Sequence, residues 1–395
     1  MKILHLIANL ATRYGGPSQA ILGMTKSLVE LGNEVTIFTT NQDGDKELDV
    51  PLYEPLVKDG VNIVYFPIQN PRFFGTSLPM ARHLKKALKN HEFDIVHIHS
   101  LYLFHGAVAA SYCRRYNIPY IIRPHGTLDP FLQKRNRGRK AIVEILFENR
   151  NLNYASALHY TTEEEKVLAR PFVGHDRGFI VPNGLYLEDY LITVNKGEFR
   201  NKHPQTANKK IILFFSRLNF KKGLDILIEA YSELLLERED IHLVITGPDN
   251  DGYGDKVRQW IEEKKIESHV TFTGMLTGLE KHQVLRDADV FVLPSYSENF
   301  GISVIEAMIS GLPVIISNKV NIYRELLDHE AGEVVNCDPI EVRSSISRII
   351  DDNEYALKLS RNGYEFVSSN YDWNKVGLKL YKNYELILST SHAVK

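Results

Sequence analysis

Two doubly wound α/β domains that face each other across a cleft are the fold class that this sequence predicts, on three observations. The chain has 395 residues, which is long for a single hydrophobic core, so two domains are expected. Short apolar runs alternate with segments of helical periodicity, a pattern typical of parallel sheets covered by helices. The pattern breaks once, at a polar stretch near the middle of the chain, and then starts again.

The first half opens with a predicted strand at Ile3–Ala8. The segment after it places Ala20, Met24 and Leu28 on one helix face and ends at Gly32. Six further strands are expected, at Glu34–Thr40, Val61–Phe66, Ile95–His99, Tyr120–Arg123, Ala157–Thr161 and Gly178–Val181. The apolar start is short and has a single Lys, so we interpret it as a strand and not as a signal peptide, which predicts a cytoplasmic protein.

The second half restarts with a strand at Lys210–Ser216 and a helix whose apolar positions include Leu224, Leu227 and Tyr231. Its remaining strands are expected at Ile241–Thr246, Val270–Thr273, Val290–Leu293 and Pro313–Ile316. The polar stretch 188–209 is the predicted linker between a first domain, 1–187, and a second, 210–372. The last helix, near Trp373–Leu388, can pack on either domain.

Composition excludes several classes of protein. Lys and Arg number 47 and Asp and Glu number 49, so the basic excess that general nucleic-acid binders show is missing. The two cysteines, Cys113 and Cys337, match no metal or redox spacing. Apolar runs all fall short of the roughly 20 residues that a membrane helix needs.

Glycine and polar residues follow five of the predicted strands, at the sheet edge where open α/β folds bind ligands. These features are Gly15-Gly16, His125-Gly126, Arg217 with Lys222, Gly274, and Glu298. Two cations and two helix N-termini suit a diphosphate, and the carboxylates of Glu298 and Glu306 suit sugar hydroxyls. The sequence therefore predicts a nucleoside diphosphate sugar, bound between the two domains.

Three other interpretations of these residue types are weaker. Glu298 and Glu306 could form the acid/base pair of a hydrolase, but their spacing does not place both on one bond. Asp287-Ala-Asp289 is similar to a metal-binding pair, yet it precedes its strand and is predicted to cap a turn. His97 and His99 could bind a metal, but no third ligand is suitably spaced, so we expect them to line the cleft.

A local basic run extends from Lys134 to Lys140 and includes Arg135, Arg137 and Arg139. One interpretation is a solvated loop. The other is an acceptor-side patch, which meets either an anionic lipid surface at the inner face of the membrane or a pyrophosphate-linked acceptor.

The run from Ser295 to Met308 places seven residues between Glu298 and Glu306, and it resembles the motif of two glutamates separated by seven residues in the retaining glycosyltransferases of family 4 (group 1). Supporting motifs occur in the family's order: Gly15-Gly16-Pro17, Arg123-Pro124-His125-Gly126-Thr127, Pro182-Asn183-Gly184, Ser216-Arg217-Leu218, Lys221-Lys222-Gly223 and Phe272-Thr273-Gly274. The resemblance covers nearly the whole chain. It implies the GT-B fold, with the C-terminal segment 373–395 packed back on the first domain.

The resemblance also implies residue roles. Arg217 and Lys222 stabilise the departing diphosphate. Glu298 holds the donor sugar, Glu306 holds the ribose hydroxyls, and His125 lies by the sugar at the reacting face. The implied nucleotide-sugar contacts are Gly15, Gly16, Arg217, Lys222, Gly274, Met275, Glu298, Asn299, Phe300, Gly301, Ile302 and Glu306. No metal or other cofactor is implied.

We therefore expect a metal-independent, retaining hexosyltransferase. It would use a UDP-sugar, with UDP-glucose as the first choice, and a polysaccharide or lipid-linked saccharide acceptor. Two alternatives stay open at this point: a sugar-nucleotide epimerase of similar shape, which needs no acceptor, and a sugar-binding protein without chemistry.

Overall fold

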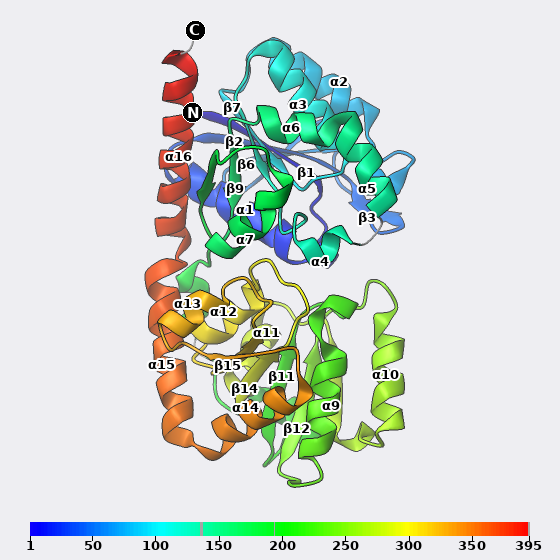
Figure 1. Ribbon diagram of the computed structural model, residues 1–395, viewed down its shortest axis with the longest axis vertical. Coiled ribbons are helices and arrows are strands. Elements are labelled where there is room, and N and C mark those ends of the chain that lie inside the picture. The colour runs from blue at the N-terminus through cyan, green and yellow to red at the C-terminus, as the bar shows by residue number, and fades with distance from the viewer. Residues whose placement is uncertain (135–136, 193, 394–395) are drawn as a thin grey trace. The chain divides into compact units, whose positions relative to one another are not determined.

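The computed structural model describes residues 1–134, 137–192 and 194–393, which divide into two compact units (Figure 1). Unit 1 comprises Met1–Gly184 together with the C-terminal segment from Trp373, and unit 2 comprises Leu185–Asp372. Each unit is built on a mainly parallel sheet, so the predicted α/β class with two Rossmann-like sheets is confirmed.

The sheet of unit 1 has the strand order β10-β9-β8-β7-β1-β2-β6-β5, and only the outer strand β5 is antiparallel to its neighbour. Its strands are β1 (Lys2–Asn9), β2 (Glu34–Thr40), β5 (Pro55–Lys58), β6 (Val61–Phe66), β7 (Ile95–His99), β8 (Tyr120–Arg123), β9 (Ala157–Tyr160) and β10 (Gly178–Ile180). A two-stranded hairpin pairs β3 (Gln42–Asp43) with β4 (Lys46–Glu47). The strand order reverses between β1 and β7, which makes this the ligand-binding position of a doubly wound sheet.

The helices of unit 1 are α1 (Gly16–Glu30), α2 (Leu78–Lys89), α3 (Phe104–Tyr116), α4 (Pro130–Gln133), α5 (Arg137–Val143), α6 (Asn149–Tyr154), α7 (Glu163–Ala169) and α16 (Trp373–Ala393). The last of these, α16, packs on α1. Glycines permit this close approach, because a Cβ on Gly23 would lie 2.2 Å from the Trp373 ring and one on Gly377 would lie 2.5 Å from Ser27 Oγ. The final two residues of segment 373–395 lie outside the described residues.

The sheet of unit 2 is entirely parallel, in the order β13-β12-β11-β14-β15-β16. Its strands are β11 (Lys210–Phe215), β12 (Ile241–Thr246), β13 (Val270–Gly274), β14 (Val290–Leu293), β15 (Val314–Ser317) and β16 (Glu333–Val335). The helices are α8 (Glu198–Lys202), α9 (Leu224–Leu234), α10 (Tyr253–Glu263), α11 (Gly278–Asp287), α12 (Ile302–Ile309), α13 (Tyr323–Asp328), α14 (Pro339–Asp351) and α15 (Asn353–Asn370). Here the order reverses between β11 and β14.

The polar stretch 188–209 is not a free linker, which corrects the prediction from the sequence. It belongs to unit 2, where it forms the short helix α8 and a 3-10 turn at Pro204–Thr206. The Phe199 side chain is buried in the core of that unit. The prediction was wrong because the polar residues of this stretch hold it in place through hydrogen bonds and ion pairs more than through apolar packing. Residue 193 is not among the described residues.

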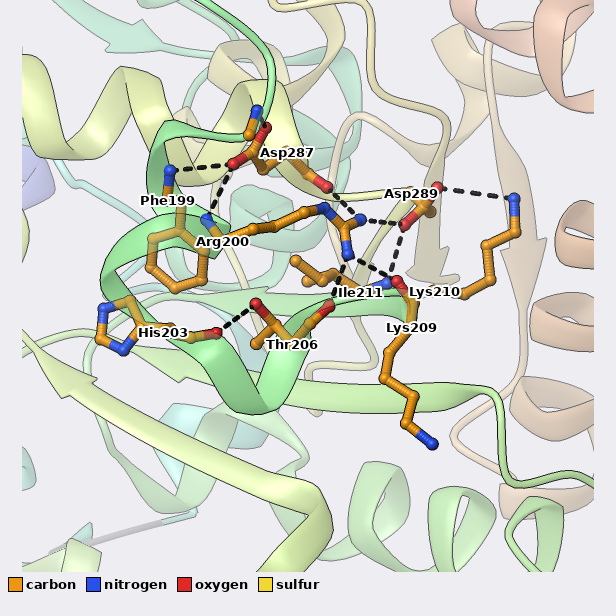
Figure 2. A network of polar contacts seen from close by, with 10 residues as sticks. Phe199, Arg200, His203, Thr206, Lys209, Lys210, Ile211, Asp287 and Asp289 are labelled. Atoms are coloured by element: carbon orange, nitrogen blue, oxygen red, sulfur yellow. Dashed lines mark hydrogen bonds and ion pairs between the residues drawn. The ribbon is translucent and has the colours of Figure 1, made fainter.

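Asp287 and Asp289 supply those hydrogen bonds (Figure 2). The Asp287 carboxylate accepts from the backbone N–H groups of Gly197, Phe199 and Arg200, at 2.5, 2.9 and 3.1 Å, and so caps the start of α8. Asp289 pairs with Arg200 at 3.0 Å and accepts from the Ile211 N–H at 2.8 Å. The structure thus assigns both carboxylates to holding 196–211 in place, the capping role that the sequence indicated.

Within the described parts of the chain, no helix has both the length and the apolar character needed to cross a bilayer.

Candidate active site

Lys222 and Glu298 form a direct ion pair in unit 2, and both side chains are largely buried. They come from the loops after β11 and β14, the two strands at which the sheet order reverses. Gly223 lets these loops touch: its φ is 69°, and a Cβ there would lie 2.0 Å from the Pro294 carbonyl oxygen. A hydrogen bond of 2.7 Å from the Tyr296 N–H to the Lys221 carbonyl joins them further. The topology therefore brings together two residues that are 76 positions apart.

The ion pair fixes the charge of Glu298. Burial by itself raises the pKa of this carboxyl, but the charge and hydrogen bond of Lys222 outweigh it and lower the pKa to about 2. Arg217 adds to the same field and is half-buried. Among the described residues Arg217 has no hydrogen-bond or ion-pair partner, so its guanidinium is available to an anion.

Glu306 lies on α12 and is held by two residues that the sequence did not single out. Its Oε1 accepts a hydrogen bond of 2.7 Å from the Tyr190 hydroxyl and pairs with Lys281 at 2.8 Å. Burial first, and then the Glu306 carboxylate, raise the pKa of Tyr190 well above its usual value, so the phenol stays a donor. Tyr190 was missed because it lies in the stretch predicted as a linker. The mutual neutralisation of Glu298 with Lys222 and of Glu306 with Lys281 does not suit the acid/base pair of a hydrolase.

Residues 299–302, predicted to contact the nucleotide sugar, lie at the N-terminus of α12. Gly301 is the N-cap residue, with φ 77° in the left-handed region, and Ile302 is the first residue of the helix. The Phe300 side chain is buried edge-on against Tyr371, with 5.2 Å between ring centroids. The start of α12 is a positive helix end, where backbone N–H groups can serve as donors to an anion.

Gly274 is the last residue of β13 and Met275 follows it, and both are exposed. The Gly274 carbonyl accepts a 2.8 Å hydrogen bond from the Gly247 N–H. The φ of Gly274 is 71°, and beyond its chain neighbours no atom of the described structure lies within 4 Å of the position that a Cβ would take there. The structure therefore places them at the same sheet edge as Lys222 and Glu298, three strands away from β14 in the order.

In unit 1, Gly15 and Gly16 lie at the start of α1, after a 3-10 turn at Thr12–Tyr14 that follows β1. Gly15 has φ 67° and serves as the N-cap residue, and Pro17 lies at the start of the helix. The first N–H groups of a helix lack partners within it, so anion binding at this turn stays a prediction that the helix start is suited to.

His125 lies in a left-handed turn after β8, with φ 54°, and Gly126 continues it with φ 73°. The buried Glu165 carboxylate holds the turn, because it accepts from the Gly126 N–H at 2.7 Å and from the Thr161 N–H at 2.7 Å. Such a conformation is costly for a residue with a Cβ and persists only where the surroundings impose it.

His97 and His99 do not line a cleft, contrary to the prediction, because both are fully buried in the sheet of unit 1. The third histidine that the sequence spacing lacked comes from the neighbouring strand, as His5 on β1 pairs in register with His97 on β7. One ring nitrogen from each of the three residues lies within 4.8 Å of the others.

This cluster is better explained as a hydrogen-bonded network than as a metal centre. Both ring nitrogens of His97 and both of His99 already have hydrogen-bond partners. The buried Arg123 guanidinium contributes a positive charge that lowers the pKa of every one of these imidazoles and opposes a bound cation.

Comparison with known proteins agrees with this geometry. The model of "Glycosyltransferase Family 4" matches residues 14–189, and that of "Glycosyl transferases group 1" matches residues 195–366. An uncharacterised glycosyltransferase of Methanocaldococcus jannaschii is 27% identical over 95% of both chains. The alpha-monoglucosyldiacylglycerol synthase of Streptococcus pneumoniae is 24% identical over 90% of this chain and 80% of its own length.

Among solved structures, Anabaena HepE in complex with UDP-glucose superposes with a TM-score of 0.77 at 18% identity, over 98% of this chain and 99% of the other. At this identity the likeness concerns the fold, which is GT-B. The two family models together span most of the chain and meet near residue 190, close to the boundary between the two units. The chain belongs to family 4 of the glycosyltransferases, the group 1 enzymes, which use nucleotide-sugar donors.

Proposed function

We propose that this glycosyltransferase is a metal-independent, retaining hexosyltransferase that transfers glucose from UDP-glucose to a lipid-linked saccharide, in the cytoplasm at the inner face of the membrane. The proposal of a nucleotide-sugar donor is supported by the contact between Lys222 and Glu298, with Arg217 nearby. Cations for a diphosphate and a carboxylate for sugar hydroxyls thus lie side by side, as a nucleotide sugar requires.

UDP-glucose is the first choice because HepE, of the same fold, was solved with it and because the pneumococcal relative is named for a glucosyl lipid. A thermal-shift panel of nucleotide sugars tests the donor. A ligand at 100 times its dissociation constant adds about 2.7 kcal/mol to the unfolding free energy, so the true donor should raise the midpoint clearly. The Glu306→Ala variant is the control, because Glu306 is expected to hold the donor in the ground state, and it should lose most of that shift. A larger shift with another nucleotide sugar would replace UDP-glucose.

The acceptor side of the proposal rests on the helical segment that follows α4. Lys134, Arg137 and Lys140 line a pocket of about 370 Å³, which also contains Phe172. Lys140 points inward, donating to the Leu132 carbonyl at 2.7 Å and lying over the Tyr102 ring. Residues 137–140 of the run are therefore helical, and Lys140 is only partly solvated. Arg135 lies outside the described residues, as does the side chain of Arg139.

Exposed apolar side chains favour a lipid-linked acceptor over a free polysaccharide. Ile145 and Leu146 follow α5 and are 81% and 71% exposed. Apolar side chains beside cations are typical of surfaces that meet anionic lipids.

The acceptor is tested with the double variant Lys134→Ala/Arg137→Ala in a transfer assay. We expect a higher Michaelis constant for a lipid-diphosphate acceptor, an unchanged constant for the donor, and a smaller effect at high salt. Arg115→Ala, an exposed cation on α3 of the same unit, is the matched control. Equal activity on acceptors without lipid or phosphate would contradict the lipid-linked assignment, and product formed without any acceptor would point to an epimerase.

A further inference from the structure

Three imidazoles form a chain of hydrogen bonds from the middle of the unit 1 sheet to the turn that carries His125. His5 Nδ1 lies 3.0 Å from His99 Nε2, and His99 Nδ1 lies 3.0 Å from His125 Nε2. His5 and His99 are fully buried, whereas His125 at the end of the chain is only half-buried.

All three imidazoles are neutral near pH 7. Burial, and then the charge of Arg123, lowers the pKa of His5 to about 3. Burial first of all also lowers the pKa values of His99 and His125 well below the ordinary value. A neutral imidazole carries one N–H and one acceptor nitrogen, so each link of the chain has a direction.

The donor-to-acceptor direction of these hydrogen bonds follows from His5, the buried end of the chain of imidazoles. His5 Nε2 is buried and has no hydrogen-bond partner among the described residues. A buried N–H without a partner is rarer and more costly than a buried lone pair, so the hydrogen of His5 belongs on Nδ1. His5 then donates to His99 Nε2, and His99 Nδ1–H donates to His125 Nε2. The hydrogen of His125 is left on Nδ1, the nitrogen that faces away from the chain.

We propose that His5 and His99 are positioning residues that hold His125 as its Nδ1–H tautomer, so that His125 offers a ligand a hydrogen-bond donor and not a base. This inference rests on the proposed function and on the family resemblance, which implies that His125 lies by the donor sugar. A neutral donor suits a sugar oxygen, and it excludes His125 as the group that removes a proton from the acceptor hydroxyl.

A second histidine branch in the same unit provides a matched control. His159 Nε2 donates to the Val181 carbonyl at 2.7 Å, which leaves His159 Nδ1 to accept from His97 at 3.4 Å. The Tyr384 hydroxyl then donates to His97 Nδ1 at 2.6 Å. This branch is equally buried, but none of its hydrogen bonds reaches His125.

The first test measures the tautomer directly. In the full chain labelled with ¹⁵N-histidine, long-range ¹H–¹⁵N correlation reports which ring nitrogen carries hydrogen, and His125→Gln identifies the signals of His125. We expect hydrogen on Nδ1 of His125. Hydrogen on Nε2 would overturn the proposal. No substrate is needed, so this result stands apart from success or failure of the proposed function.

The second test uses variants in the transfer assay. His99→Leu removes both links and should lower kcat about 10- to 100-fold, as losses of orienting partners do, with a smaller change in donor KM. His99→Asn places an amide N–H where Nδ1 was, so it should recover most of that loss. Tyr384→Phe should lower the thermal midpoint but keep kcat near that of the wild type.

Two outcomes of these variants would contradict a positioning role. Equal losses of kcat in His99→Leu, His99→Asn and Tyr384→Phe would show that the cluster matters only for folding. Zinc retained by the full chain on dialysis, and lost in His5→Ala, would make the cluster a metal site.

Discussion

Lys222 and Glu306 lie in the same unit, but they are expected to affect different kinetic constants. Negative charge grows on the diphosphate as the glycosidic bond breaks, so Lys222 interacts more strongly in the transition state than in the ground state. Lys222→Ala should therefore lower kcat by about 10²–10³. Glu306, expected to hold the ribose, binds both states alike, and Glu306→Ala should mainly raise donor KM, by the equivalent of about 1.5–3 kcal/mol.

Steady-state kinetics of the two variants check this prediction. Lys256→Ala, which removes a lysine from α10 of the same unit, serves as the control. If Glu306→Ala abolished turnover and Lys222→Ala left it unchanged, the assignment of Lys222 to the leaving group would be wrong.

The pKa of Glu298 makes a prediction about acid stability. Its folded pKa of about 2 lies below its ordinary value of 4.5, so the ion pair stabilises the fold above pH 4.5. That stabilisation is lost as the pH falls from about 4.5 to about 2. In urea denaturation, the wild type should be more stable than Glu298→Gln at neutral pH, and the two curves should converge across this window. A constant difference down to pH 2 would contradict the shifted pKa.

Candidate site residues could be proposed from the sequence where their chemistry is local. Lys222, Glu298 and the glycine turns at 15–16 and 301 could be found because each follows a predicted strand. Tyr190, Lys281 and Glu165 could not, since each acts through a contact with a residue more than 20 positions away. His5 was not singled out from the sequence, although it forms the buried end of a hydrogen-bonded chain.

Helix α8 depends on a carboxylate from another element. Asp287→Ala would remove the acceptor for three N–H groups at its start, and we expect it to lower the free energy of unfolding by about 2 kcal/mol. The kcat of the folded variant should stay unchanged, since the hydrogen bonds of the Asp287 carboxylate in the described structure all go to residues 197–200. Urea denaturation with Asp45→Asn, an exposed carboxylate, as control checks the effect. A loss of kcat without a loss of stability would return Asp287 to the active site.

Elements with a strong apolar period could be predicted from the sequence. Strands β1, β7, β11 and β14 are buried along nearly their whole length, and their bounds agree with the predicted ones within one or two residues. Strand β5 was missed because all four of its residues are exposed. Helix α8 was missed because polar contacts, and not an apolar face, hold it.

For the molecule as a whole, we expect transfer to proceed without a divalent metal ion. Arg217, Lys222 and the N-terminus of α12 supply positive charge for a diphosphate, and the carboxylates of Asp287 and Asp289 are already used by backbone N–H groups and Arg200. Turnover should therefore survive an excess of EDTA in an assay with purified donor and acceptor. Activity that EDTA abolishes and manganese restores would contradict this expectation.

The contact between Lys222 and Glu298 also bears on how a catalytic cycle ends. One ammonium group has two competing anions, the carboxylate it touches and the diphosphate it is expected to bind. While a sugar is attached, its hydroxyls can satisfy Glu298 and free Lys222 for the phosphates. Once the sugar has been transferred, Glu298 loses those hydroxyls and competes for Lys222 again, which weakens the hold on the spent nucleotide. The same ion pair would thus promote product release, and Glu298→Gln should be inhibited by UDP at lower concentrations than the wild type.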